Sequence, residues 1–201
     1  MRIILASTSP RRRKLLILLG IPFDIIPPDV DESIYISNGD PIDFCCDLSK
    51  LKAENVGQHN PSDLVIGADT IVVLKNEILE KPADRTEAEE MLEKLSGQTH
   101  HVYTGVSILN INESINITFY ERTEVIFEKL AKEDIQFYID NFPPYDKAGS
   151  YGIQDWSAVF IKEINGCFNN VVGFPLSKFF KTLRALKVDV KINDKLLGQQ
   201  N

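Results

Sequence analysis

Residues 5–14, LASTSPRRRK, predict a strand that turns directly into a helix. Arg2 to Leu5 form the expected strand. Ser9 has the right chemistry for a helix N-cap, and Pro10 suits the first helical position. The apolar run 15–19 continues the helix, and a glycine at position 20 ends it. The chain is therefore expected to begin with a strand–helix unit joined by a short polar turn.

The predicted helix opens with four consecutive cations, Arg11 to Lys14. A helix N-terminus carries partial positive charge, so each cation there loses roughly 0.3–1 kcal/mol. A bound anion would reverse the sign, because free backbone N–H groups and guanidinium groups would both donate to it. The alternative is a solvated basic turn. The polar turn, the cap and the arginine run together favour a phosphate-binding site.

Composition and charge narrow the class of protein. With 201 residues, 43% hydrophobic and 25% charged, the chain is expected to be a soluble globular protein of one domain or two closely joined lobes. Its net charge of −7 argues against a stable nucleic-acid partner, so the basic cluster suits a small anionic ligand. Cys45, Cys46 and Cys167 match neither a disulfide framework nor a zinc spacing.

The N-terminus lacks the features of a signal peptide, and no run reaches the ~18 apolar residues of a membrane span. We therefore expect a cytoplasmic protein that does not associate with membranes.

The order of the remaining elements predicts an α/β fold with a partly antiparallel sheet. Helices are expected from Asp40 onward, over 86–96 with a capping box from Thr86 to Glu89, over 131–140 and over 175–186. Strands are expected at 64–74, at 158–164, and as two or three antiparallel strands within 102–127. These elements make a single domain over residues 1–187, followed by a polar tail over 188–201.

Lys52 and Asp69 stand where the pattern requires apolar residues. At about 100° per residue, Lys52 is the one charged residue of the second helix that falls within its apolar stripe. That stripe comprises Phe44, Cys45, Leu48, Leu51 and Val56. Asp69 interrupts the apolar run 64–74, and an isolated buried carboxylate is very costly, so it must be solvated, paired or bound to a metal. The alternatives are a lysine that snorkels at the stripe's edge and a loop aspartate.

Further candidates are Lys81, which precedes a proline, and residues 146–154, whose two glycines permit close approach of backbone to a ligand. His100 and His101 lack a partnered cysteine or acid pattern and are interpreted as structural.

Together the charged candidates suit phosphoryl chemistry. Arg11, Arg12, Lys52 and Lys81 could balance a triphosphate, while Asp31, Glu32 and Asp69 supply hard oxygen ligands for Mg²⁺ or Mn²⁺. Such a set favours attack by water on phosphorus, with a carboxylate that orients or deprotonates the water. The P-loop signature and the serine nucleophile motif G-x-S-x-G are both missing, which argues against a P-loop NTPase and against acyl transfer.

Six segments in the same order resemble the Maf family of nucleotide pyrophosphatases. They are 5–12 (LASTSPRR), 67–70 (GADT), 80–82 (EKP), 95–97 (LSG), 146–154 (DKAGSYGIQ) and 170–176 (NVVGFPL), and the resemblance covers about residues 2–177. It implies an elongated mixed β-sheet flanked by helices, with two lobes and a central cleft, similar to inosine-triphosphate pyrophosphatases. It also implies hydrolysis of a nucleoside triphosphate to monophosphate and pyrophosphate with a divalent metal, Mg or Mn, by a homodimer.

The resemblance also assigns roles to residues. Asp69 matches the family's proton acceptor. Asp69 and Glu32, whose hard oxygen ligands were noted above, are the expected metal ligands. The polar residues of the family's cleft match Ser7, Arg11, Arg12, Glu32, Lys52 and Lys81. Arg11, Thr70 and Gln154 fall where the family sets substrate choice. The form Tyr-Gly-Ile-Gln resembles the branch that acts on dTTP and UTP, with modified pyrimidine nucleotides as further candidates. A primary amide can donate and accept together, as the O4/N3–H edge of uracil or thymine requires.

Two departures from the family pattern bear on base selection. Asp155-Trp156 follows Gln154 where the family more often has small residues, and Phe174 stands where leucine is usual. Three other functions stay open: a 7-methyl-GTP pyrophosphatase, a nucleotide-binding regulator of septum formation without turnover, and a nucleic-acid-binding module. The last relies on residues 11–14 alone, and the acidic balance and lack of an aromatic stacking pattern count against it.

Overall fold

The computed structural model describes residues 1–32 and 40–187, and these contain a seven-stranded sheet with helices packed against it. The strand order is β2-β1-β3-β5-β6-β7, and β4 pairs with β3. β1 is parallel to β2 and β3, whereas β4 and β7 are antiparallel to their neighbours. The expected mixed α/β fold is confirmed.

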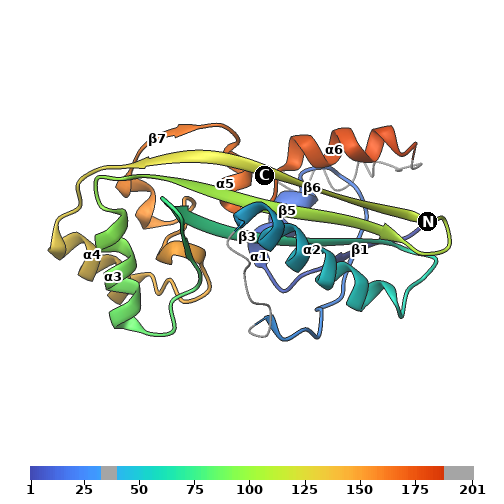
Figure 1. Ribbon diagram of the computed structural model, residues 1–201, viewed down its shortest axis with the longest axis horizontal. Helices are drawn as coiled ribbons and strands as arrows, with labels where there is room; N and C mark the ends of the chain where they lie inside the picture. Colours follow the sequence, from blue (N-terminus) through green and yellow to red (C-terminus); the bar gives the residue numbers. More distant parts are fainter. Residues whose placement is uncertain (33–39, 188–201) are drawn as a thin grey trace. The chain divides into compact units, whose positions relative to one another are not determined.

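The elements follow one another along the chain as Figure 1 shows. The strands are β1 (Ile3–Ala6), β2 (Asp24–Ile25), β3 (Leu64–Leu74), β4 (Glu77–Leu79), β5 (Thr99–Asn110), β6 (Ile115–Phe127) and β7 (Ile161–Asn165). The α-helices are α1 (Pro10–Ile17), α2 (Pro41–Gly57), α3 (Arg85–Leu95), α4 (Lys132–Asn141), α5 (Phe168–Val172) and α6 (Leu176–Ala185). Two short 3₁₀ turns are η2 (Ala148–Ser150) and η3 (Trp156–Phe160).

The chain divides into two compact units. Unit 1 comprises Met1–Asp69, Thr104–Glu121 and the chain from Gly173 onward; unit 2 comprises Thr70–Tyr103 and Arg122–Val172. Strands β3, β5 and β6 contribute residues to both. A division into two units agrees with the expected pair of lobes, whereas a cleft between lobes stays a prediction. The proposed tail, 188–201, lies outside the described residues.

In unit 1, helix α2 packs directly against the sheet because two strands carry glycine beneath it. A side chain at Gly67 of β3 would overlap the carbonyl oxygen of Ser49, and one at Gly105 of β5 would overlap that of Cys45. Asp40 caps the helix as expected by accepting a hydrogen bond from the backbone N–H of Ile42. The predicted apolar stripe is buried apart from Leu51, which is half-buried. The close approach of α2 fixes the side chains on its inner face.

In unit 2, helices α3 and α4 lie side by side (Figure 1) and pack on an apolar core that includes Leu92 and Tyr138. The expected capping box at Thr86 is wrong. Asp84 caps α3 instead by accepting from the N–H of Glu87, and Glu87 accepts from the N–H of Ala83. Asp84 and Glu87 have the same three-residue spacing as Thr86 and Glu89, and aspartate is a stronger N-cap than threonine.

The strand predicted at 158–164 begins later than expected, at Ile161 of β7. The side chain of Asp155 accepts a hydrogen bond from the N–H of Ser157 and so starts the 3₁₀ turn η3 in the preceding residues. A local side-chain-to-backbone bond of this kind competes with strand formation. Among the described residues, no helix has both the length and the apolar character that crossing a membrane requires.

His100 is a fully buried residue of β5, which supports the structural interpretation. Its Nε2 lies 2.8 Å from the Tyr151 hydroxyl, and its ring packs edge-on against Phe127 and Tyr151. Its Nδ1 has no hydrogen-bond partner among the described residues. Burial, with a smaller contribution from His101, lowers the pKa of His100 to about 3. The folded protein therefore keeps this imidazole neutral.

We expect His100→Gln to weaken the pH dependence of stability. Between the unfolded pKa of about 6.5 and the folded pKa of about 3, only the unfolded chain binds the proton, so wild-type stability falls as the pH falls through this window. Urea unfolding at about pH 7 and pH 5 measures this effect. Between these pH values the free energy of unfolding of wild type should fall by roughly 2 kcal/mol more than that of the variant, because one proton bound only by the unfolded chain is worth about 1.4 kcal/mol per pH unit. Equal losses would contradict a buried neutral imidazole.

Candidate active site

The first part of the site is the turn that joins β1 to α1 in unit 1. Ser7 is buried, and its hydroxyl accepts hydrogen bonds from the N–H of Ser9 at 3.1 Å and from Nη1 of Arg12 at 3.4 Å. Ser9 caps the helix by accepting from the N–H of Arg12. Nε of Arg12 donates to the carbonyl oxygen of Gly173 at 3.0 Å. The guanidinium group is therefore held in place by the turn and by the chain that leads into α6.

The four cations of α1 divide into two pairs. Arg13 and Lys14 are exposed, as a solvated basic turn predicts, whereas Arg11 and Arg12 are half-buried. Burial lowers the pKa of Arg12; Asp69 and Glu32 oppose this effect, and Arg11 adds to it. Charges that perturb one another in this way lie close together. Arg12 therefore interacts electrostatically with Arg11, Glu32 and Asp69, which all belong to unit 1; we call these four residues, together with Lys52, the charged cluster of unit 1.

Lys52 bridges the two acids of this cluster. Its Nζ lies 2.6 Å from Oδ1 of Asp69 and 3.0 Å from Oε1 of Glu32. The exposed fractions of Lys52 and Asp69 are only 5% and 7%, and Asp69 lies within β3 rather than in a loop. Both alternative interpretations, a snorkelling lysine and a loop aspartate, are therefore wrong. The buried ammonium compensates a buried carboxylate that would otherwise be very costly.

The two carboxylates form a donor set that fits a hard divalent cation. Mg²⁺ in proteins usually takes one or two carboxylates, with waters and substrate phosphates completing its shell. Asp69 and Glu32 meet that requirement, since both lie within 3.0 Å of the same ammonium nitrogen. Among residues 1–32 and 40–187, no group of three or more His, Cys, Asp or Glu is placed to hold a metal ion. Asp31 is exposed beside Glu32.

Thr70, Lys81 and Gln154 belong to unit 2. Thr70 follows Asp69 in β3 and is half-buried, whereas Lys81 and Gln154 are exposed. The carbonyl oxygen of Glu80 accepts a hydrogen bond from the N–H of Gly149 at 3.0 Å, which ties the chain beside Lys81 to the glycine-containing loop. A shared site with the cluster of unit 1 stays a prediction.

The model for the family described as Maf-like protein matches residues 2–186. The chain belongs to the Maf family. Proteins from Bacillus anthracis and from Bacillus thuringiensis subsp. konkukian, both named dTTP/UTP pyrophosphatase, are 47% identical to it over 189 residues. These alignments cover 94% of this chain and 97% of each relative.

Solved structures similar to this Maf chain share little sequence with it. A dITP/XTP pyrophosphatase from Mycobacterium abscessus is 11% identical with a TM-score of 0.47, covering 94% of this chain and all of that one. A HAM1 protein from Coxiella burnetii is 14% identical with the same TM-score, covering 92% of this chain and 99% of that one.

The departure from the Maf pattern at Phe174 has a packing explanation. Phe174 is fully buried, and its ring lies edge-on against Phe179 of α6. The role of the preceding Gly173 was missed in the sequence. Its carbonyl oxygen accepts a hydrogen bond from Nε of Arg12. The position of Gly173 within the family segment 170–176 was the feature of the sequence that could have indicated a role.

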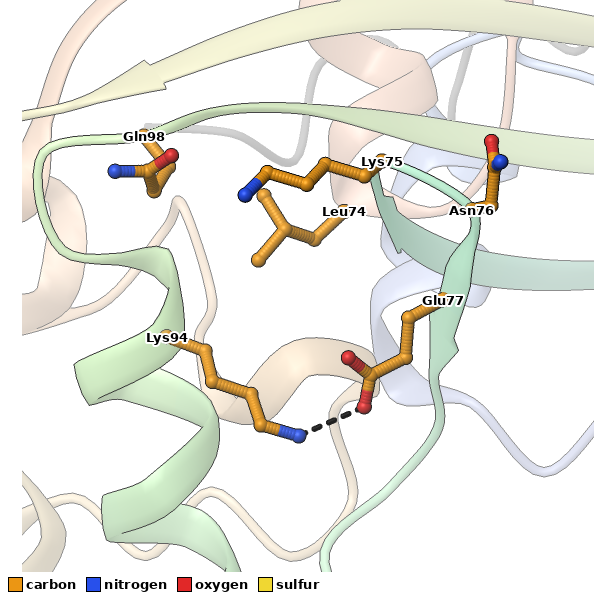
Figure 2. Close-up of a pocket in the computed structure, with 6 residues that line it drawn as sticks. All are labelled: Leu74, Lys75, Asn76, Glu77, Lys94 and Gln98. Atoms are coloured by element: carbon orange, nitrogen blue, oxygen red, sulfur yellow. Dashed lines mark hydrogen bonds and ion pairs between the residues drawn. The ribbon is translucent and has the colours of Figure 1, made fainter.

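A pocket of about 410 Å³ lies at the β3–β4 hairpin of unit 2. Figure 2 shows the residues that line it. It is lined by Leu74, Lys75, Asn76, Glu77, Lys94 and Gln98. The Nζ of Lys94 lies 2.7 Å from a carboxylate oxygen of Glu77, so this pair of charges is compensated internally. None of the predicted Maf site residues lines this pocket, so it gives no support to the candidate active site.

Proposed function

We propose that this protein hydrolyses dTTP and UTP to the nucleoside monophosphate and pyrophosphate. The observation that carries the proposal is the buried Lys52–Asp69 pair, with Glu32 on the same ammonium and Arg11 and Arg12 in the same charged cluster. Relatives with 47% identity named dTTP/UTP pyrophosphatase support the choice of nucleotide. The activity would remove these nucleotides, and modified pyrimidine nucleotides, from the precursor pool.

The proposed role of Arg11 and Arg12 is to bind the polyphosphate. Guanidinium groups match phosphate oxygens with parallel N–H donors, and the N-terminus of α1 adds its partial positive charge. Ser7 and Gly173 orient Arg12 for this task, because they accept from Nη1 and Nε of its guanidinium group. Desolvation of Arg12 strengthens its attraction for an anion.

The proposed reaction begins with the release of Asp69 from Lys52. Phosphate oxygens compete for the Lys52 ammonium, and the carboxylate of Asp69 can then accept a proton from the attacking water. The oxygen of this water forms a bond to phosphorus while the bridging P–O bond between the α- and β-phosphates breaks, and pyrophosphate leaves. Lys52 stabilises the negative charge that develops on the phosphate oxygens in this step. Lys81 is proposed to neutralise phosphate charge in the same way, as the family resemblance implies.

Asp69 and Glu32 are proposed to hold the divalent metal, Mg or Mn. The metal would neutralise phosphate charge and polarise the phosphoryl group that is attacked. Glu32 then has two uses: it pairs with Lys52 in the protein alone and offers an oxygen ligand when the nucleotide arrives. Thr70 and Gln154 are proposed to contact the base, and Gln154 is exposed and so accessible to it.

The test is a nucleotide panel with Mg²⁺, assayed for pyrophosphate release. Wild type should act on dTTP and UTP, and Gln154→Ala should lose the preference for them while still cleaving triphosphates. Gln98→Ala, which removes another exposed glutamine of unit 2, is the matched control and should retain the preference. Pyrophosphate release from 7-methyl-GTP alone would place the protein in the family branch that acts on 7-methyl-GTP. Tight nucleotide binding without pyrophosphate release would favour a regulator of septum formation instead.

Three further proposals concern the domain boundaries, the oligomeric state and the cellular location of the protein. We propose one functional domain over 1–187, which the family match to 2–186 supports, followed by a tail over 188–201. We also propose a homodimer, which the family resemblance implies, and a cytoplasmic location without membrane or stable nucleic-acid partners. Light scattering of the purified protein tests the dimer, and a monomeric mass at working concentration would contradict it.

A further inference from the structure

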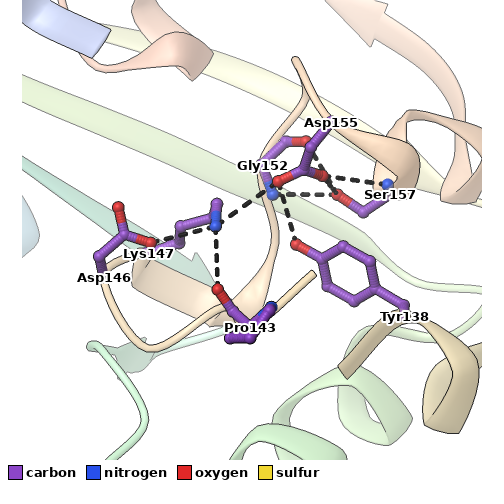
Figure 3. Close-up of polar contacts among 7 residues, drawn as sticks. All are labelled: Tyr138, Pro143, Asp146, Lys147, Gly152, Asp155 and Ser157. Carbon is purple, nitrogen blue, oxygen red and sulfur yellow. Dashed lines mark hydrogen bonds and ion pairs between the residues drawn. The ribbon is translucent and has the colours of Figure 1, made fainter. Parts of the chain in front are cut away.

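Asp155, the residue after Gln154, is the centre of a set of polar contacts in unit 2 (Figure 3). One carboxylate oxygen accepts from the N–H of Ser157 at 3.1 Å and lies 2.7 Å from the Ser157 hydroxyl. The other accepts from the hydroxyl of Tyr138 at 3.4 Å and lies 3.5 Å from Nζ of Lys147. Burial raises the pKa of Tyr138, so its hydroxyl stays protonated and can donate.

Lys147 connects the beginning of the loop to this carboxylate. Only 14% of its side chain is exposed, and Nζ donates to the carbonyl oxygen of Pro143 at 3.3 Å and to Asp146 at 3.0 Å. The loop from Lys147 to Asp155 is therefore fastened at both ends by a single ion pair. We call Lys147 and Asp155 the loop clamp.

Gly152 lets the loop pass directly over the clamp. A Cβ at this position would lie 2.9 Å from the Asp155 carboxylate and from the Lys147 side chain. The Gly152 N–H donates to the Ser157 hydroxyl at 3.0 Å, and the same hydroxyl lies 2.8 Å from the Gly152 carbonyl oxygen. The Ser157 hydroxyl therefore accepts from the Gly152 N–H, and its single proton is shared between the Gly152 carbonyl oxygen and the Asp155 carboxylate.

Gln154 is exposed, whereas the residues on either side of it are held in place by packing. Tyr151 and Ile153 are buried, whereas Gln154 is exposed. Trp156 anchors the following turn, since its ring stacks at 6.4 Å on Phe142 and lies 5.0 Å from Phe137. The two residues that depart from the family pattern, Asp155 and Trp156, therefore both restrain the backbone next to Gln154.

We propose that Lys147 and Asp155 are positioning residues that fix Gln154 for recognition of the pyrimidine base. This inference rests on the proposed function, in which Gln154 contacts the base. A recognition group that is ordered before binding loses less conformational freedom when the ligand arrives, so affinity and selectivity rise. The partners named above for the clamp all belong to unit 2, whereas most residues proposed for phosphate chemistry belong to unit 1, so loss of the clamp should change base preference rather than the chemical step.

Asp155→Asn and Lys147→Gln test the clamp, because each removes one charge; the first retains side-chain size, and the second replaces the lysine by a shorter polar side chain. Both should raise KM for dTTP and lower the preference for dTTP over GTP by about five- to tenfold, the equivalent of one well-placed hydrogen bond. The kcat for dTTP should stay within about twofold, since the phosphate chemistry is untouched. The double variant should be no worse than either single variant, as expected for one shared interaction.

The matched control is Glu77→Gln, which breaks the exposed ion pair to Lys94 in the same unit and should leave both constants unchanged. Hydrogen exchange of the segment 147–157 should be faster in both clamp variants than in wild type. It provides a readout of loop order that does not depend on turnover.

The outcomes separate this inference from the proposed function. Unchanged KM and preference in the clamp variants, with a lowered preference in Gln154→Ala, would overturn the clamp and leave the function intact. A lowered kcat with unchanged KM, or unchanged hydrogen exchange, would also overturn it. An unchanged preference in Gln154→Ala would overturn the base-reading role of Gln154 and the clamp together, and pyrophosphate release would still report on the enzyme activity.

Discussion

Replacing Asp69 by Asn should reduce kcat for dTTP by about 10²–10⁴-fold, the contribution typical of a positioned general base. Asparagine has nearly the same shape but cannot accept the proton of the attacking water. It also weakens the proposed metal site by removing one of two carboxylates. The variant should remain folded, because Lys52 keeps Glu32 at 3.0 Å. We expect the free energy of unfolding to fall by about 3 kcal/mol, the low end for a broken buried pair.

The control for this variant is Asp140→Asn, an exposed aspartate that pairs with Arg85 at 3.0 Å. It removes the same charge, and exposed pairs contribute little, so kcat and stability should stay close to wild type. Steady-state pyrophosphate release and urea unfolding measure both variants. Turnover by Asp69→Asn within tenfold of wild type would show that Asp69 is not the proton acceptor.

Replacing Lys52 by Met should reduce both activity and stability. The ammonium no longer offsets developing phosphate charge, and the loss of one such group typically lowers kcat by about 10²–10³-fold. Asp69 is left buried beside Glu32 without its cation, and such an uncompensated charge costs about 3–5 kcal/mol. Divalent metal should recover part of this stability, because it can take the place of the missing positive charge between the carboxylates.

A thermal-unfolding series with and without Mg²⁺ or Mn²⁺, in the absence of nucleotide, measures this effect. The melting temperature of Lys52→Met should rise with metal by more than that of wild type, whose own ammonium competes with the metal. Lys94→Met, which removes an exposed lysine paired with Glu77, should respond like wild type. A Lys52→Met protein that does not respond to metal would contradict Asp69 and Glu32 as metal ligands.

Local features of this fold were predictable because they depend on short spacings. Ser9-Pro10 and Asp40-Pro41 define the starts of α1 and α2 as expected, since capping involves only neighbouring residues. Helical periodicity placed Lys52 within the apolar stripe of α2, although it did not exclude a lysine that snorkels at the stripe's edge. The start of α3 was wrong because the Thr86–Glu89 spacing was interpreted as the capping box, whereas Asp84, two residues earlier, caps the helix.

Contacts that depend on tertiary packing were not predictable. The bond from Arg12 to the Gly173 carbonyl joins residues 161 positions apart, and the close approach of α2 to Gly67 depends on how the helix lies on the sheet. The pairing of Lys52 with both Asp69 and Glu32 is of the same kind, although each residue was a candidate by itself. The sequence identified the charges, and the packing determined which of them meet.

The central claim is that the charged cluster of unit 1 binds a nucleoside triphosphate and cleaves it between the α- and β-phosphates. Phosphorus NMR of wild-type protein with dTTP and Mg²⁺ tests it most directly. The dTTP signals should be replaced by those of dTMP and pyrophosphate. Signals of dTDP and inorganic phosphate, or dTTP that persists unchanged, would contradict it.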